Sequence, residues 1–182
     1  MIWHRTLLLT AALLLPAQTT PPAPEKPEQL APYFPTPETI VVKMLELGHL
    51  KAGEKMFDLG SGDGRIVIAA AGKFHADSTG VELDPQLARE SETKIRQKHL
   101  QKIARIIEGD IVRQNYSSAD LITVYLFPSS NDKIQPMLER QLKKGTRIVA
   151  HDFEFRGWTP EKTEVIEDDG EGRSHTLFLY RR

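Results

Sequence analysis

Strand-like and helix-like segments alternate along most of the chain, and this alternation limits the folds that it can adopt. Short apolar runs predict strands, and the longer amphipathic segments between them predict helices. Alternating strands and helices form a parallel, doubly wound α/β sheet with helices on both faces. The strands are predicted over residues 55–59, 78–83, 104–108, 120–127, 146–151, 162–167 and 174–181, and the helices over residues 37–47, 65–74, 85–100 and 131–142.

Three local signals refine this plan. The last two predicted strands follow each other with no helix between them, so we expect a seven-stranded, mostly parallel sheet with an antiparallel last strand. Thr36 before Pro37 predicts a helix start in which the threonine hydroxyl caps the first turn. Pro136 lies inside the last predicted helix, where a proline removes a backbone hydrogen bond, so we expect a break there.

The segment from Phe57 to Arg65, with the sequence FDLGSGDGR, carries the most informative motif. It follows a predicted strand and opens a predicted helix. Its glycines let the backbone turn sharply and let a ligand approach the main chain, and the helix start adds free N–H donors. A plain tight turn is the simpler alternative, but the position between a strand and a helix favours a ligand site.

The acids beside these glycines distinguish between two kinds of nucleotide ligand. A dinucleotide site uses G-x-G-x-x-G and holds a doubly negative pyrophosphate. Here the loop reads G-x-G-x-G and is flanked by Asp58 and Asp63, which would repel a pyrophosphate. Two carboxylates suit the ammonium and sulfonium groups of S-adenosylmethionine, so the charge favours that cofactor over NAD.

Two further strand ends carry acids in register with this loop. Glu82 ends the second predicted strand about 20 residues beyond the loop, where an acid can accept hydrogen bonds from both ribose hydroxyls. Asp110 and Ile111 follow the third predicted strand, where a carboxylate can accept from an adenine amino group and an apolar side chain can cover the ring. An exposed acid and a Gly-Asp turn are the ordinary alternatives.

Together these motifs resemble the successive cofactor motifs of class I S-adenosylmethionine-dependent methyltransferases, which have a Rossmann-like α/β fold. Further matches at residues 33–37, 124–128 and 145–153 resemble one subfamily of small bacterial methyltransferases. That subfamily is similar to the mitochondrial protein-lysine methyltransferases of the ATP synthase c-subunit and the adenine nucleotide translocase. The resemblance covers residues 32–182 and implies methyl transfer to a protein lysine, with a small-molecule or lipid acceptor as the second enzymatic interpretation.

Carried over residue by residue, the resemblance implies a cofactor site. The parts of the cofactor are expected on separate groups of residues: its methionine end on Asp58, Gly60, Ser61, Gly62, Asp63 and Gly64, its ribose on Glu82, and its adenine on Asp110 and Ile111. The resemblance also implies a lid over the cofactor, formed by Tyr33, Phe34 and Thr36.

The acceptor site is less well marked. Many amino-group methyltransferases carry Asn/Asp-Pro-Pro-Tyr/Phe after the fourth strand, where this chain has the sequence YLFP at residues 125–128, which argues against methylation of DNA bases or glutamine. Tyr125 is predicted to form a wall of the acceptor channel, with His151 and Asp152 as candidates to position the amine. A purely structural role for His151 and Asp152 is the alternative. A catalytically silent cofactor-binding module is the alternative to an enzyme.

The first part of the chain is typical of a targeting segment followed by a tether. A short basic start and an apolar run over residues 6–15 predict a secretory signal over residues 1–18, and the run is shorter than the roughly 20 residues that a membrane span needs. Eight of the 12 prolines lie between Pro16 and Pro37, so residues 19–32 are predicted to be an extended linker before a domain over residues 33–182. Export, to the periplasm or out of the cell, conflicts with the cytosolic origin of S-adenosylmethionine, so an exported and a cytoplasmic location both stay open.

The amino-acid composition limits the kinds of molecule that the protein is expected to bind. The net charge is −1, from 24 basic and 25 acidic residues, so the chain lacks the broad positive field of a general nucleic-acid binder and we expect a protein acceptor instead. The basic side chains between Lys94 and Arg105 are interpreted as a solvated helix face. There is no cysteine, and the histidines other than His99 and His151 show no metal-ligand spacing, so no metal site is expected. The sequence does not indicate an oligomeric state.

Overall fold

The computed structural model describes residues 29–182, so the predicted signal segment and most of the predicted linker lie outside the described residues. Seven strands form: β1 (Lys55–Leu59), β2 (Asp77–Glu82), β3 (Ala104–Glu108), β4 (Leu121–Val124), β5 (Arg147–His151), β6 (Lys162–Ile166) and β7 (His175–Arg181). They are joined by the helices α1 (Glu38–Leu47), α2 (Arg65–Phe74), α3 (Pro85–Gln97) and α4 (Pro128–Gln141) and by a single 3₁₀ turn, η1 (Ile111–Arg113).

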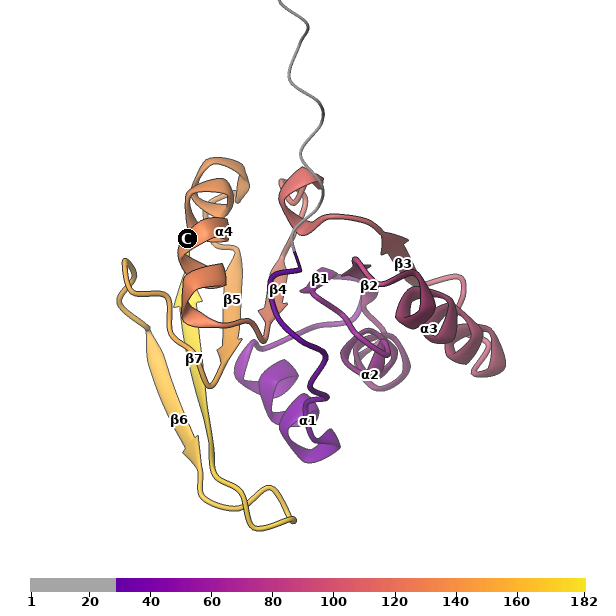
Figure 1. Ribbon diagram of the computed structural model, residues 1–182, viewed down its shortest axis with the longest axis horizontal. Helices are drawn as coiled ribbons and strands as arrows, with labels where there is room; N and C mark the ends of the chain where they lie inside the picture. Colours follow the sequence, from indigo (N-terminus) through magenta and orange to yellow (C-terminus); the bar gives the residue numbers. More distant parts are fainter. Residues whose placement is uncertain (1–28) are drawn as a thin grey trace, which may run out of the picture.

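The strands form one sheet in the order β3-β2-β1-β4-β5-β7-β6 (Figure 1). Neighbours from β3 to β5 pair in parallel, whereas β7 runs antiparallel to both β5 and β6. The prediction of a mostly parallel sheet with an antiparallel last strand is therefore confirmed. The chain order reverses between β1 and β4, and such a switch point opens a ligand crevice beyond the carboxyl ends of the strands.

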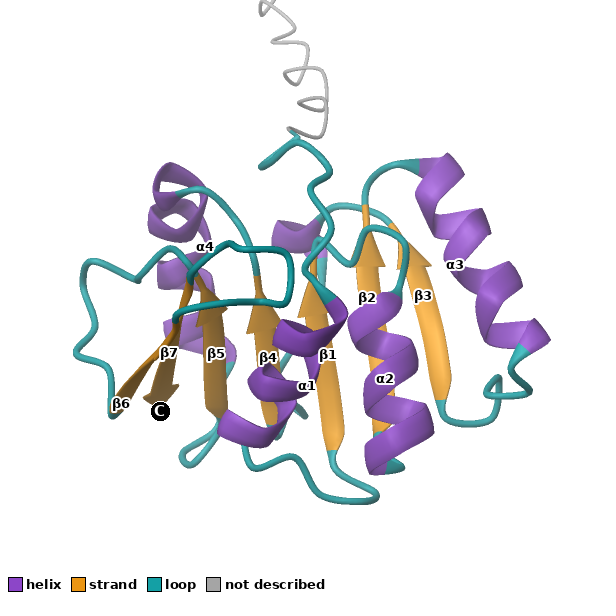
Figure 2. Cartoon of the chain, turned by 90° about the horizontal axis from the view of Figure 1, so that it is seen from below, coloured by secondary structure: helices purple, strands orange, loops and turns teal. Residues whose placement is uncertain are grey.

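Helices cover both faces of the sheet (Figure 2). On one face α1 and α2 pack against the sheet through a fully buried cluster that includes Ile40, Met44 and Met56. On the other face α4 contributes Ile134 and Leu138 to a second buried cluster that also contains residues of β1, β4 and β5. Both clusters remove apolar surface from water and fix the sheet rigidly beneath the loops that follow its strands. No helix in the part of the chain from residue 29 onward is long and apolar enough to cross a membrane.

The segment around α4 differs from the prediction in two ways. Strand β4 ends at Val124, three residues early, and α4 begins at Pro128 rather than at residue 131. Proline at the first helical position lacks an N–H that would have no partner there in any case. The predicted break at Pro136 is wrong, because α4 is one continuous helix. Its buried face packs on the sheet, and this packing compensates for the hydrogen bond that the proline removes.

The start of α1 also differs from the prediction. Pro37 is the residue that caps α1, and no side chain bonds to the first turn. The predicted capping role of Thr36 is therefore wrong. Its hydroxyl instead lies 3.3 Å from the Nδ1 atom of His151, at the end of β5. A contact across the fold takes the place of the local cap.

Candidate active site

A cleft lies beyond the carboxyl ends of β1, β2 and β4, at the switch point of the sheet. The chain before α1 passes over these strand ends (Figure 2) and closes one side of the cleft. Residues 29–32, which the sequence places in the linker, also line the cleft, and the Leu30 carbonyl accepts a hydrogen bond from the Ser130 hydroxyl. Most of the predicted cofactor residues line this one cleft: Tyr33, Phe34, Thr36, Asp58, Gly60, Ser61, Gly62, Asp63, Glu82 and Ile111.

The glycine loop brings its backbone directly under the segment before α1. Gly62 has a φ of +52°, in the left-handed region, and a Cβ atom placed on it would lie 2.8 Å from the Tyr33 ring. Only glycine meets both conditions without strain. Gly64 is not among the residues that line the cleft, because it caps the start of α2 and packs against Ser91 of α3.

Glu82 joins the glycine loop to the end of β2. Its carboxylate accepts hydrogen bonds from the Gly62 amide, at 2.7 Å, and from the Asp84 amide, at 2.9 Å. These bonds hold the acid at the carboxyl end of its strand, inside the cleft and 9% exposed. Glu82 therefore both supports the loop and presents an acceptor to a ligand.

Asp58 is a buried acid at the centre of the sheet. In the register of the strands it lies opposite Gly80 of β2 and Thr123 of β4. The Thr123 hydroxyl donates a hydrogen bond of 2.8 Å to it. Burial raises the pKa of Asp58 to about 7 against the lowering effect of this bond, and the charges of Glu82 and Asp63 raise it further. A cation placed beside Asp58 would reverse this shift.

Asp63 has a different environment, because it is already paired with cations. Its carboxylate lies 2.9 Å from the Arg65 guanidinium and 2.8 Å from the Lys94 ammonium. Burial acts to raise the pKa of Asp63, but the hydrogen bonds from Arg65 and Lys94 outweigh it and lower the pKa to about 2. The other acids that line the cleft are Asp58, Glu82 and Asp84, and the Asp84 carboxylate caps the start of α3. The sequence places Lys94 on a solvated helix face, but in the structure its ion pair with Asp63 supports the glycine loop.

The predicted adenine residues are placed differently from each other. Ile111 lines the cleft. The Asp110 carboxylate points back onto η1, where it accepts a hydrogen bond of 3.0 Å from the Val112 amide and lies 3.6 Å from Arg113. Asp110 is not among the residues that line the cleft, so its contact with adenine stays a prediction.

Aromatic side chains gather where the cleft meets the surface. Tyr33 and Phe34 are 45% and 54% exposed, which leaves part of each ring open to solvent. Phe34 makes an edge contact with Tyr125, with ring centroids 6.5 Å apart, and the Arg173 guanidinium lies 5.8 Å from the Phe34 ring. Phe127, 45% exposed, makes an edge contact with Phe153 nearby. These rings form an apolar entrance beside the cofactor cleft.

Of the three predicted acceptor residues, only Tyr125 lines the cleft. Its hydroxyl donates a hydrogen bond of 3.2 Å to Asp152, and burial raises the pKa of Tyr125 to about 12, with the Asp152 charge acting in the same direction. The phenol is therefore protonated at neutral pH. His151 and Asp152 lie behind Tyr125, and His151 is fully buried. Burial lowers the pKa of His151 to about 4, so its imidazole is neutral.

Sequence reasoning missed two residues of the side-chain cluster around His151 and Asp152: His175 contacts both of them, and Asp169 contacts His175. His175, at the start of β7, has its Nδ1 atom 2.9 Å from His151 Nε2, and Asp169, in the loop before β7, lies 3.2 Å from His175 Nε2. Neither residue belongs to a motif, and each is far along the chain from β5. Only the antiparallel return of β7 beside β5 brings them together.

Comparison with known proteins matches this chain to methyltransferases. Residues 58–162 match the model of the family described as the ANTKMT methyltransferase domain. A protein-lysine N-methyltransferase of Saccharolobus islandicus is 39% identical over 82% of this chain and 92% of its own length. The lysine N-methyltransferase of the ATP synthase C-subunit from Rattus norvegicus is 30% identical over 81% of this chain and 68% of its own length.

A solved structure gives the same result for the fold. A protein of Salinibacter ruber described as an RNA methyltransferase, crystallised with S-adenosyl-L-homocysteine, superposes with a TM-score of 0.75. It is 35% identical, and the match covers 81% of this chain and 93% of that protein.

The fold and the cleft at its switch point define an S-adenosylmethionine-dependent methyltransferase with a Rossmann-like α/β domain. The buried Asp58, with its raised pKa, and the Ser61 hydroxyl, buried without a hydrogen-bond partner among the described residues, fit a cationic and polar cofactor in this cleft. The chain belongs to the ANTKMT methyltransferase domain family. The predicted family, fold and cofactor are confirmed.

Proposed function

We propose that this enzyme transfers the methyl group of S-adenosylmethionine to the ε-amino group of a lysine in a protein. The observation that carries the proposal is the 39% identity with a protein-lysine N-methyltransferase over 82% of this chain and 92% of that relative. The aromatic entrance beside the cleft supports it, because a lysine side chain carries its amino group on a long apolar stem that can pack against such rings.

We infer that the cofactor extends along the carboxyl ends of three strands. The methionine end would lie beside Asp58 and the glycine loop, from Gly60 to Gly64. The ribose would bind Glu82, whose acceptor oxygens face the cleft. The adenine would pack on Ile111 near Asp110. In this arrangement the segment with Tyr33, Phe34 and Thr36 covers the cofactor, and Asp58 faces its positive charge.

Methyl transfer is an in-line displacement. The lone pair of the amine forms a bond to the methyl carbon, the bond from that carbon to sulfur breaks, and its electron pair stays on sulfur as S-adenosylhomocysteine leaves. Because sulfonium is already a good leaving group, the protein contributes mainly alignment and exclusion of water. We propose that Tyr125 supplies one wall of the path along which the amine approaches.

The lysine ammonium must lose its proton before it can attack. A protonated phenol cannot accept that proton, so Tyr125 is not the base at neutral pH. An apolar, aromatic channel lowers the pKa of an amine within it, because burial disfavours the charged form. We therefore propose that the entrance formed by Phe34, Tyr125 and Phe127 favours the neutral amine and that water carries the proton away.

RNA is the second candidate acceptor, because the Salinibacter ruber protein is described as an RNA methyltransferase. The net charge of −1 weighs against RNA, since a general RNA-binding surface is strongly basic. One experiment separates the two. The enzyme is incubated with methyl-labelled S-adenosylmethionine and cell lysate, and portions of the product are treated with protease or with ribonuclease.

For a lysine acceptor, the label survives ribonuclease, is released by protease and is recovered as methyl-lysine after acid hydrolysis. Gly62→Arg is the matched negative control, because the long side chain would fill the space below Tyr33. Label that ribonuclease removes would assign RNA as the acceptor instead. Label only in lipid or small molecules, or cofactor binding without transfer to any fraction, would also contradict the proposal.

A further inference from the structure

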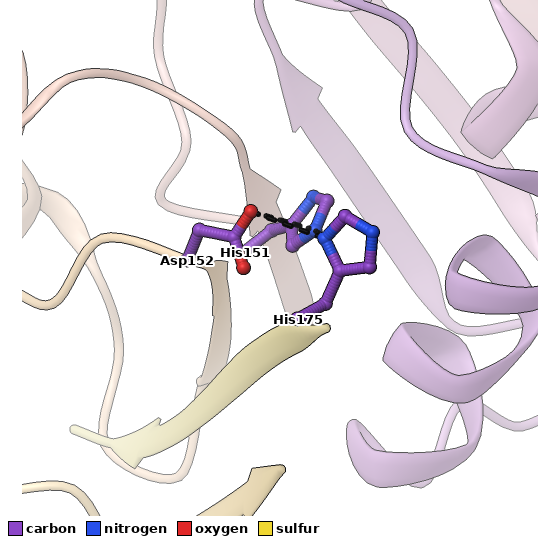
Figure 3. Close-up of side chains that lie close together, drawn as sticks. All are labelled: His151, Asp152 and His175. Atoms are coloured by element: carbon purple, nitrogen blue, oxygen red, sulfur yellow. Dashed lines mark hydrogen bonds and ion pairs between the residues drawn. The ribbon is translucent and has the colours of Figure 1, made fainter. Parts of the chain in front are cut away.

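Tyr125 contacts His151 and Asp152. These two residues and His175 each bring one potential metal-ligand atom close to the others (Figure 3). The Nε2 atom of His151 lies 2.9 Å from the Nδ1 atom of His175. The Oδ2 atom of Asp152 lies 3.3 Å from the first nitrogen and 3.1 Å from the second. The three atoms thus form a nearly equilateral triangle, made by the end of β5 and the start of β7.

The size of this triangle matches one face of a metal coordination sphere. Ligand atoms held about 2.0–2.2 Å from a metal ion lie roughly 3.0–3.5 Å apart in octahedral or tetrahedral geometry. An ion about 1 Å out of the plane of this triangle would therefore reach all three atoms at normal bond lengths. Two imidazoles and one carboxylate are also a ligand set that divalent transition metals use.

Each histidine has a partner on its other ring nitrogen. Thr36 Oγ1 lies 3.3 Å from His151 Nδ1, and Asp169 Oδ2 lies 3.2 Å from His175 Nε2. A carboxylate at Nε2 fixes the proton on that nitrogen and leaves the lone pair of His175 Nδ1 facing the triangle. Metal-bound histidines are held in this way by outer partners, which set the tautomer and the ring orientation.

The charges in the cluster also favour a cation. Asp169 lies 3.3 Å from the Arg173 guanidinium, which is shared with Glu171 at 2.7 Å. Among residues 29–182, no lysine or arginine forms an ion pair with Asp152: its Oδ1 accepts from the Thr176 amide, and its Oδ2 faces Tyr125 and the two histidines. His151 is fully buried and His175 is 5% exposed, so this negative charge lies beside imidazoles that water hardly reaches. The Asp152 side chain itself is 24% exposed, so its charge is only partly removed from water, and a cation beside it would stabilise that charge.

We propose that His151, Asp152 and His175 bind a divalent first-row transition-metal ion of the Zn²⁺ type. On binding, the ring proton of His151 moves to Nδ1, where it is donated to the Thr36 hydroxyl, and no net proton is released. The bound ion links Asp152, the residue after β5, to His175, the first residue of β7. It also holds Asp152, and through it the Tyr125 hydroxyl, behind the cofactor cleft. This inference does not depend on the identity of the methyl acceptor.

The test uses the full chain without a polyhistidine tag, after treatment with a chelator and its removal. Co²⁺ is titrated first, because its visible absorption reports coordination by protein ligands, and Zn²⁺ is then added to displace it. We expect one ion per chain, and an increase in the melting temperature with Zn²⁺ but not with Mg²⁺. His175→Asn should weaken binding at least about 100-fold, and Asp169→Asn about 10–100-fold, as loss of a ligand and of an outer partner do.

His99→Asn is the matched control, because His99 is exposed and asparagine tolerates its left-handed φ of +58°. It should bind the ions as the unaltered chain does. Circular dichroism verifies that each variant is folded, and the titration of the unaltered chain is decisive by itself. No saturable Co²⁺ spectrum in that chain would overturn the proposal and leave the cluster as a hydrogen-bonded network. Stoichiometric binding retained by His175→Asn would overturn it as well.

Discussion

The Tyr125 ring lies against the His151 imidazole, with the ring centroids 3.9 Å apart and the planes tilted by 34°. One face of the tyrosine therefore covers a fully buried histidine, while the residue itself lines the cofactor cleft. Tyr125 separates two chemically different spaces, an aromatic entrance for the acceptor and a polar cluster of histidines and aspartates. The relationship explains why the tyrosine, and not the histidine, faces the cleft.

Replacement of Tyr125 should distinguish the ring from its hydroxyl. Tyr125→Phe keeps the wall and loses one hydrogen bond, to Asp152, so kcat/KM should fall no more than about tenfold. Tyr125→Ala removes the wall, and the misaligned amine should lower kcat/KM by about 100-fold or more. Steady-state kinetics and calorimetric binding of S-adenosylmethionine measure the two effects. A Tyr125→Phe variant as slow as Tyr125→Ala would assign the main role to the hydroxyl.

Binding of the cofactor should depend on pH through Asp58. Its pKa of about 7 in the free enzyme means that the acid is partly protonated at neutral pH. A cationic cofactor favours the carboxylate, so binding releases a proton and the affinity should rise from pH 6 to pH 8 and then level off. Calorimetry in two buffers with different ionisation enthalpies measures the proton release.

The matched variant for this prediction is Asp58→Asn, which keeps the shape and cannot titrate. It should bind S-adenosylmethionine about tenfold or more weakly at pH 8 and show no rise in affinity between pH 6 and pH 8. Unchanged affinity in Asp58→Asn would remove Asp58 from the cofactor site.

Gly62→Ala should weaken cofactor binding by more than its loss of stability explains. The new Cβ would lie 2.8 Å from the Tyr33 ring, so the segment over the cleft must move. The left-handed φ of +52° adds a cost of about 1–2 kcal/mol to the free energy of folding. Gly53→Ala is the control, because Gly53 has a φ of +78° and nothing lies within 4 Å of a Cβ there. Equal affinities in the two variants would show that Tyr33 does not cover the cofactor.

Asp63→Asn should destabilise the fold above pH 4. The pKa of Asp63 falls from 3.8 to about 2 in the folded state, so its contribution to stability is present above pH 3.8 and is lost as the pH falls through 2. After allowance for solvent screening we expect a loss of about 1–2 kcal/mol in the free energy of unfolding at pH 6, and much less at pH 2. Denaturant unfolding at the two pH values measures it.

The control for Asp63 is Asp132→Asn, because Asp132 forms an ion pair with Arg156 in which the two side chains are 41% and 68% exposed. Such surface pairs contribute little, so this variant should unfold within about 0.5 kcal/mol of the unaltered chain. If both variants lost the same stability, the two cations around Asp63 would have no special effect.

Local patterns in the sequence predict most of the fold and the position of the cleft. The apolar runs, the glycines and the acids at the strand ends lie within a few residues of the strands and loops that they specify. Asp58, for example, belongs to β1 and directly precedes the glycine loop. The structure differs from the sequence-based prediction at positions whose conformation depends on residues far away in the chain. Thr36 bonds to a histidine 115 residues away instead of capping its own helix, and Pro136 stays within a helix because that helix is packed on the sheet.

The sequence by itself thus determined the order of strands and helices, the loop at the switch point and the kind of cofactor, because each of these is encoded within a short window. The tertiary structure decided the electrostatics. It paired Asp63 with Lys94, 31 residues away, and it placed His175 and Asp169 against the end of β5. These partners meet only when separate strands and helices pack together, and burial then shifts the pKa values by amounts that no local pattern contains.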